Sequence, residues 1–115
     1  FFILINVDCF FYLKIVLQKL LCHNKNMTLE KTRKEIDALD DQIIALLERR
    51  MSLVDEVITA KAEENKNVYD ADREYFILEK IKKRTEKLQY EPAIHSIYKE
   101  IMKRSREYQE KNRFK

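Results

Sequence analysis

The sequence predicts an all-α fold of three helices, one of them very long, and three observations support this. The chain has 115 residues, a length that suits a single domain. It contains no glycine and one proline, Pro92, so sharp turns and sheet corners lack their usual residues. After residue 27, apolar residues recur at helical spacing through most of the chain.

The first 26 residues differ in composition from the rest of the chain. They are mostly apolar, but Asp8, Lys14 and Lys19 interrupt the run. A membrane span needs about 20 nearly uncharged residues, and a secretory signal needs a basic start, an apolar run and a small-residue cleavage site in that order. Neither pattern is present, so we expect a cytoplasmic protein that does not cross a membrane.

A helix start follows directly after this segment. In MTLEKTRKEID, Thr28 can cap a helix and Glu30 suits its first turn. We therefore expect Met27 to be the natural start, residues 27–115 to form the functional domain, and residues 1–26 to come from translated leader or added sequence. The alternative for the early segment is an amphipathic helix that lies on a membrane surface.

The first predicted helix runs without a breaker from Thr28 to about Glu64. At 1.5 Å per residue, its roughly 35 residues would extend about 50 Å, which exceeds a small domain. Only a partner of similar length can bury the apolar face of such a helix, so we expect a homodimer. The apolar residues on it are Leu29, Ile36, Leu39, Ile43, Leu46, Leu47, Val54, Val57 and Ile58.

Two shorter helices are predicted after this one. The polar residues 63–67 form a loop, and Asp70 or Asp72 can cap the second helix. Residues 83–92 form the next break, with Pro92 suited to the first turn of the third helix. The apolar residues are Tyr75, Ile77, Leu78 and Ile81 in the second helix and Ile94, Ile97, Tyr98, Ile101 and Met102 in the third, which ends near Lys111.

Cations frame part of the apolar face of the long helix. Arg50, Val54, Val57 and Lys61 are spaced by four, three and four residues, which places them on one helix face. Arg33 points elsewhere, because it lies 17 residues before Arg50, about 25 Å away along the axis and about 100° around it. Arg33 and Arg50 of one chain therefore cannot share a small ligand, although an antiparallel partner helix could bring Arg33 there.

Polar residues also replace apolar ones on the third helix and gather at the start of the second. Ser105 and Gln109, four residues apart, continue the apolar face of the third helix, and Asp70, Arg73 and Glu74 open the second. No activated nucleophile is present, because Ser105 has no histidine in a plausible local arrangement. Cations dominate, and arginine binds carboxylates in a bidentate manner, so the expected ligand is a small dianion.

Each of these residues also has an ordinary structural explanation. Arg50 and Lys61 could be flanking cations whose stems cover apolar surface. The residues that open the second helix could be a cap and a solvated ion pair. Ser105 and Gln109 could belong to a helix end that frays into water. No single residue decides between these explanations and a binding site.

The order and spacing of these residues resemble the all-helical chorismate mutases over residues 28 to about 111. RKEIDALDDQIIALLERR at 33–50, AK at 60–61 and VYDADRE at 68–74 carry the resemblance. All eight polar positions expected in that family are filled. They are Arg33 and Arg50 in the long helix, Lys61 at its end, Asp70, Arg73 and Glu74 in a D-x-x-R-E motif, and Ser105 and Gln109 in an S-x-x-x-Q motif that follows a loop one residue shorter than in familiar bacterial members.

The resemblance implies a stand-alone chorismate mutase, which rearranges chorismate to prephenate on the route to phenylalanine and tyrosine. It implies an intertwined helical homodimer whose partner chain lends an arginine to each site, with no cofactor and no metal. The implied roles are carboxylate binding by Arg33 of the partner and Arg50 with support from Arg73 and Ser105, donation to the ether oxygen by Lys61 and Gln109, and binding of the ring hydroxyl by Glu74 with the backbone near Asp70.

Two other functions stay open. Isochorismate pyruvate lyase resembles this family and also uses a helix-end lysine with arginines, although the complete set with Glu74 and Ser105 favours the mutase. A noncatalytic helical dimerisation module is the alternative from another class. Nucleic-acid binding is disfavoured, because residues 27–115 carry 20 lysines and arginines against 19 aspartates and glutamates. Cys9 and Cys22 lack the spacing of a zinc site.

Overall fold

The computed structural model describes residues 12–17 and 28–115. The chain divides into two compact units, residues 1–45 and residues 46–115, and the boundary falls inside the long helix. Residues 12–17 are helical, whereas the predictions for Met27 and for the two cysteines lie outside the described residues. Within the part that is described, no helix is both long and apolar enough to cross a membrane.

The long helix α2 spans Leu29–Glu63, which confirms the prediction of one helix of 35 residues. It is capped as predicted, since Thr28 Oγ1 accepts a hydrogen bond from the Lys31 backbone N–H at 3.3 Å. Val54 is the one buried side chain on α2. Most of its other large apolar side chains are exposed, including Leu39 at 56% and Ile43 at 52%.

The chain reverses at the end of α2 without a glycine. Asn65 adopts the left-handed conformation, with φ 54°, which asparagine tolerates better than most residues. The Lys66 N–H bonds to the Lys61 carbonyl at 2.8 Å and the Asn65 N–H to the Ala62 carbonyl at 3.3 Å, which is the Schellman pattern of helix ends. This turn brings the Val68 carbonyl back to the Lys61 ammonium, which donates a hydrogen bond to it.

The second helix, α3, spans Ala71–Arg84 and begins with a side-chain cap. Asp70 is the N-cap residue, because its Oδ1 accepts a hydrogen bond from the Arg73 backbone N–H at 3.0 Å. The structure thus selects Asp70 from the two caps that the sequence allowed. Three basic residues occupy the last turn of α3, where they interact favourably with the helix dipole.

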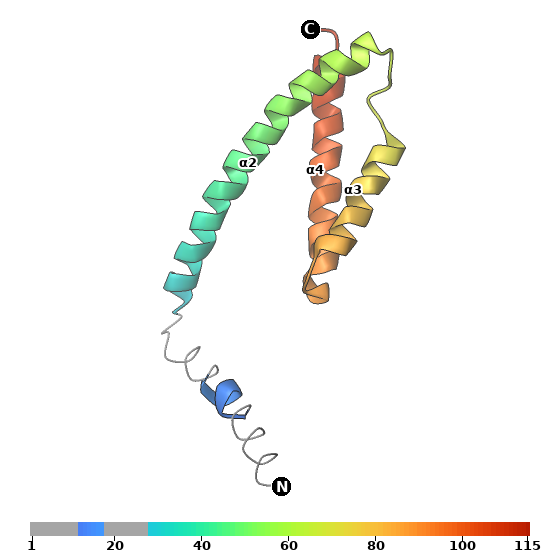
Figure 1. Ribbon diagram of the computed structural model, residues 1–115. Helices are drawn as coiled ribbons and strands as arrows, with labels where there is room; N and C mark the ends of the chain where they lie inside the picture. Colours follow the sequence, from blue (N-terminus) through green and yellow to red (C-terminus); the bar gives the residue numbers. More distant parts are fainter. Residues whose placement is uncertain (1–11, 18–27) are drawn as a thin grey trace. The chain divides into compact units, whose positions relative to one another are not determined.

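The break before the third helix contains a short 3-10 helix that no sequence signal predicted, η1, at Leu88–Tyr90. Directly after it, α4 spans Glu91–Asn112, with Pro92 in its first turn as predicted. Figure 1 shows α3 and α4 side by side. The three predicted α-helices are therefore confirmed, and residues 12–17 and 28–115 contain no strand.

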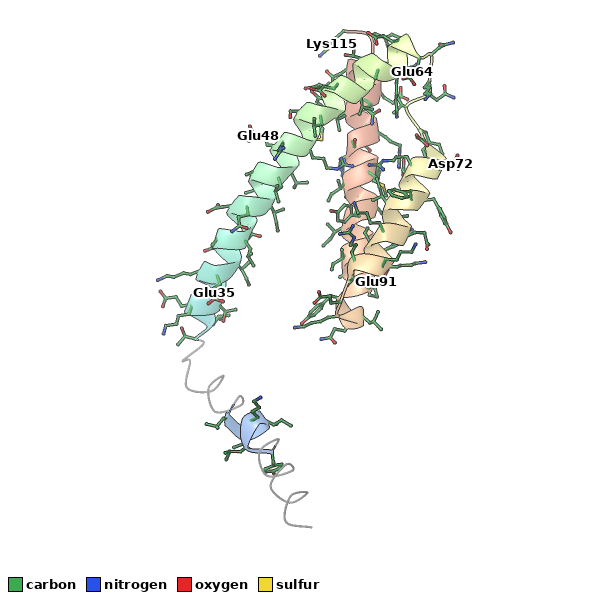
Figure 2. All side chains as sticks on the ribbon, viewed as in Figure 1. Glu35, Glu48, Glu64, Asp72, Glu91 and Lys115 are labelled. Atoms are coloured by element: carbon green, nitrogen blue, oxygen red, sulfur yellow. The ribbon has the colours of Figure 1, made fainter. Side chains whose placement is uncertain are left out.

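The core of residues 46–115 is small and draws on α2, α3, α4 and the loop before α3. Side chains of α3 and α4 fill the space between the two helices (Figure 2). The Tyr108 hydroxyl donates to Asp55 Oδ1 at 2.8 Å, which joins α4 to α2, and this hydrogen bond raises the pKa of Tyr108. The buried apolar side chains are Val54, Val68, Ile81 and Met102.

Replacing Met102 tests this core. Met102 is 4% exposed, so Met102→Ala should lower the free energy of unfolding by about 2–5 kcal/mol through lost burial and a residual cavity. Urea unfolding followed by circular dichroism measures the change. Lys103→Ala, at the exposed neighbouring position, should change it by less than about 0.5 kcal/mol. Equal losses in the two variants would contradict the placement of the core.

Candidate active site

A cavity of about 440 Å³ lies within residues 46–115, between the C-terminal part of α2, the following loop, α3 and α4. This volume suits a small-molecule ligand. Apolar side chains such as Leu53, Val57 and Ile77 contribute to its wall, and eight of its fourteen lining residues are charged or polar.

Seven of the eight predicted site residues line this one cavity. The eighth, Arg33, lies in the first unit on α2 and is exposed. Helix geometry explains the grouping, because the side chains from each helix are spaced so that they share one face. The seven residues are Arg50, Lys61, Asp70, Arg73, Glu74, Ser105 and Gln109.

Two acceptors hold the ammonium group of Lys61 in the cavity wall. Its Nζ donates to the Val68 carbonyl and to Gln109 Oε1, the latter at 3.1 Å. An ammonium group has three N–H donors, so one remains for a ligand. A flanking cation with its head group in water does not describe Lys61, because both hydrogen bonds are partly buried.

Ser105 and Gln109 are buried polar residues, only 5% and 6% exposed. The alternative of a frayed helix end is therefore wrong for them. Gln109 Nε2 lies 3.4 Å from Ser105 Oγ, which is a long and weak hydrogen bond. Because Gln109 presents its oxygen to Lys61 and only one N–H to Ser105, its second amide N–H remains available to a ligand in the cavity.

Arg50 offers a buried donor that the described residues leave without an acceptor. Its Nη1 is buried and has no hydrogen-bond partner among the residues that the structure describes. A buried donor without an acceptor is energetically costly, and a guanidinium group is best satisfied by a carboxylate. Arg73 is also free of salt bridges within the described chain, and its guanidinium lies 5.4 Å from the centre of the Phe76 ring, a cation–π distance.

Arg106 is a site residue that the sequence prediction missed. It forms a partly buried ion pair with Glu74, so Glu74 is not the solvated partner of Arg73 that the structural alternative assumed. The Arg106 guanidinium also lies 5.5 Å from the centre of the Tyr69 ring. A sequence signal existed, because Arg106 follows Met102 by four residues and precedes Gln109 by three, a spacing that places all three on one helix face.

The charges in the cavity favour a dianionic ligand. The lining contains four cations and two carboxylates, and both carboxylates already have partners, since Asp70 caps α3 and Glu74 pairs with Arg106. No cysteine or histidine is among the lining residues that the structure describes, and none of the hydrogen bonds in this part of the chain joins Ser105 to a carboxylate or a lysine. The cavity can therefore bind a dianion and stabilise developing negative charge, but it is not built for nucleophilic attack.

Comparison with protein families yields a match over most of the chain. Residues 32–110 match the family described as chorismate mutase type II. The matched range covers more than half of the chain and includes Arg33 and every residue that lines the cavity. No curated protein matches the chain.

Proposed function

We propose that this chain, which belongs to the chorismate mutase type II family, converts chorismate to prephenate by an intramolecular Claisen rearrangement. The charge pattern of the cavity carries the proposal. Arg50 offers a buried guanidinium N–H without an acceptor, and Lys61 and Gln109 lie together with N–H groups to spare. Chorismate has two carboxylates and an ether oxygen, which are the acceptors that such donors would bind.

The reaction suits a site without a nucleophile. The ether C–O bond breaks while a C–C bond forms within the same molecule, and no proton has to move. Catalysis requires that the chair-like reactive conformer be held and that negative charge on the ether oxygen be stabilised. Fixed cations and amide donors can meet both requirements, so we infer no need for a cofactor or a metal.

The carboxylates of chorismate would bind to the arginines of the cavity. Arg50 and Arg73 are free of salt bridges within the described chain and can each offer two parallel N–H groups to a carboxylate. The buried Ser105 hydroxyl can add a donor. Arg33 of a second copy of the chain would complete this set.

The ether oxygen would bind beside Lys61 and Gln109. The Val68 carbonyl and Gln109 Oε1 restrain the Lys61 ammonium, so its third N–H has a fixed direction. Such preorganised donors stabilise charge in the transition state without reorganisation. At the ring hydroxyl, Glu74 would accept through Oε2, because Arg106 engages Oε1.

The same proposal includes an intertwined homodimer. In the described chain the apolar face of α2 is largely exposed, with Val54 its one buried residue. An equally long helix from a second copy would cover that face and could bring Arg33 to the cavity. The site would then hold all eight residues that the sequence predicts.

The activity is tested directly by mixing the purified chain with chorismate. Ultraviolet absorbance follows the loss of chorismate, and acid converts any prephenate to phenylpyruvate. We expect chorismate loss with phenylpyruvate formation. Release of pyruvate from isochorismate, without chorismate rearrangement, would instead establish the lyase. A dimer that acts on neither compound would be a noncatalytic module.

Lys61→Ala should lower kcat by about 100-fold or more, because it removes a charge aimed at the ether oxygen in the transition state. Circular dichroism should show an unchanged helix content. Lys82→Ala is the matched control, since Lys82 is exposed on α3 and lies outside the cavity lining. Near-normal turnover by Lys61→Ala would remove Lys61 from its proposed role.

Gln109→Glu should make activity rise as the pH falls. An amide donates its N–H at any ordinary pH, whereas a carboxyl group donates only when it is protonated. The wild-type chain should lack this dependence on the protonation of residue 109. Profiles of kcat against pH for the two proteins measure the difference, and identical profiles would exclude Gln109 as a donor to the ether oxygen.

A further inference from the structure

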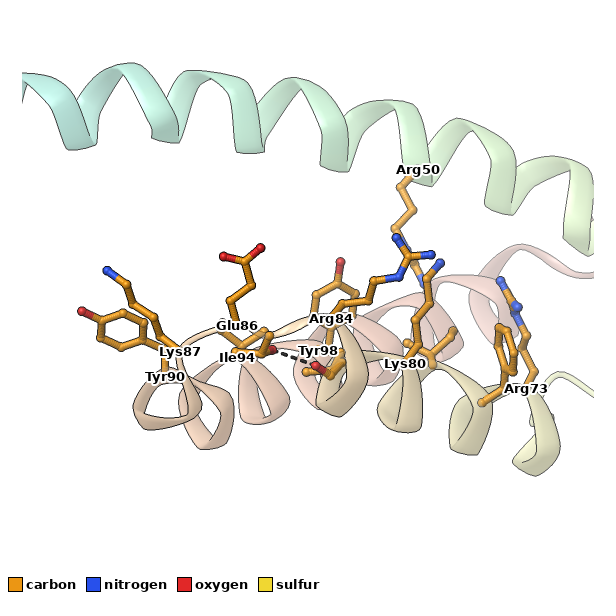
Figure 3. Close-up of a pocket in the computed structure, with 13 residues that line it drawn as sticks. Arg50, Arg73, Lys80, Arg84, Glu86, Lys87, Tyr90, Ile94 and Tyr98 are labelled. Carbon is orange, nitrogen blue, oxygen red and sulfur yellow. Dashed lines mark hydrogen bonds between the residues drawn. The ribbon is translucent and has the colours of Figure 1, made fainter.

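A second cavity, of about 590 Å³, adjoins the candidate active site and shares Arg50, Arg73 and Ile77 with it. Figure 3 shows side chains from α2 and α3 that reach into this cavity, Arg50 from α2 and Lys80 and Arg84 from α3. Its lining includes one carboxylate, Glu86, and five cations that form no salt bridge within the described chain. The five are Arg50, Arg73, Lys80, Arg84 and Lys87.

Three of these cations lie on one face of α3. Arg73, Ile77, Lys80 and Arg84 follow one another at intervals of four, three and four residues, so they share that face. Along the helix axis, Lys80 lies about 10 Å and Arg84 about 16 Å beyond Arg73. The face therefore begins with an arginine of the active site and continues as an unneutralised basic surface.

The N-terminal part of α2 repeats this spacing with the opposite charge. Arg33, Asp37, Asp40 and Ile44 also follow at intervals of four, three and four residues. Asp37 lies about 6 Å and Asp40 about 10 Å beyond Arg33 along the axis. Both aspartates are exposed, and neither forms a salt bridge with any residue that the structure describes.

We infer that Asp37 and Asp40 of a second copy pair with Lys80 and Arg84, and that these ion pairs set the register that delivers Arg33 to the active site. The inference rests on the dimer proposed above, in which the two α2 helices are antiparallel. Because the chain reverses between α2 and α3 (Figure 1), α2 of the second copy runs parallel to α3. When its Arg33 is level with Arg73, its Asp40 is level with Lys80, and Arg84 lies about one turn further.

Arg33 cannot set this register by itself. Three cations without a carboxylate partner in the described chain, Arg50, Lys61 and Arg73, already line the active-site cavity, so another cation is repelled until a dianion is bound. An apolar stripe alone specifies the pairing of two helices poorly, whereas opposite charges at matched positions fix it. The ion pairs of Asp37 and Asp40 with the cations of the adjoining cavity thus offset this repulsion. They hold Arg33 at the active site before the substrate binds.

Two charge-reversal variants of the full chain test this interface. Lys80→Glu/Arg84→Glu places acid against acid in its homodimer, and Asp37→Lys/Asp40→Lys places base against base. Each should raise the dimer dissociation constant by roughly 100-fold or more, because opposed like charges are strongly unfavourable. An equimolar mixture of the two variants should regain the wild-type dissociation constant. In the mixed dimer, one set of native aspartates faces native Lys80 and Arg84, and the introduced lysines face the introduced glutamates. Sedimentation velocity measures the dimer fraction.

Lys82→Glu/Lys111→Glu is the matched control for Lys80→Glu/Arg84→Glu, because it changes the net charge by the same amount at exposed positions outside the linings of both cavities. It should keep the wild-type dissociation constant. The inference would be overturned if either variant alone dimerised as tightly as the wild type, or if the mixture of the two stayed monomeric.

Chorismate turnover of the wild type is a separate readout. A charge-dependent dimer without turnover would refute the proposed function alone, and an active enzyme indifferent to both reversals would refute the interface alone.

Discussion

The length of α2 is the constraint on which the rest of the structure depends. It has 35 residues, whereas α3 and α4 have 14 and 22, so neither can cover its apolar face from end to end. Burying apolar surface stabilises a protein by about 25 cal/mol of free energy per Å². Most of the apolar face of α2 is exposed in the described chain, so it contributes little of this stabilisation. Association with a second copy would recover it. In the proposed dimer, the contact that completes the fold also supplies Arg33, so stability and activity would share one interface.

In the candidate site, neutral acceptors as well as an ion pair hold closely spaced cations in place. Arg50, Lys61 and Arg73 must stay close to one another without carboxylate partners that would compete with the substrate. The Val68 carbonyl and the Gln109 amide restrain Lys61, and the ring of Phe76 lies against Arg73. These contacts orient the cations and leave their positive charge uncancelled, which is what a preorganised site for a dianion requires.

Local signals made much of this fold predictable, and tertiary contacts account for most of what was missed. Residues close together in the sequence indicate the cap at Asp70, the start of α4 near Pro92 and the long helical periodicity of α2. The 3-10 helix at Leu88–Tyr90 has no side-chain cap, so this common sequence signal of a helix start is lacking. Arg106 was missed because its partner, Glu74, is 32 residues away in the sequence. The Val68 carbonyl was missed because every residue has a backbone carbonyl, so the residue type does not show which one accepts a hydrogen bond.

Subunit complementation tests most directly whether one active site takes Lys61 from one chain and Arg33 from another. Arg33→Ala and Lys61→Ala would be assayed with chorismate separately and after equimolar mixing and subunit exchange. We predict little activity for each alone and about a quarter of wild-type activity for the mixture, because half of the dimers would be mixed and each would hold one intact site. A mixture that stays inactive after demonstrated exchange, or an Arg33→Ala variant with near-normal turnover, would contradict a site shared between two chains.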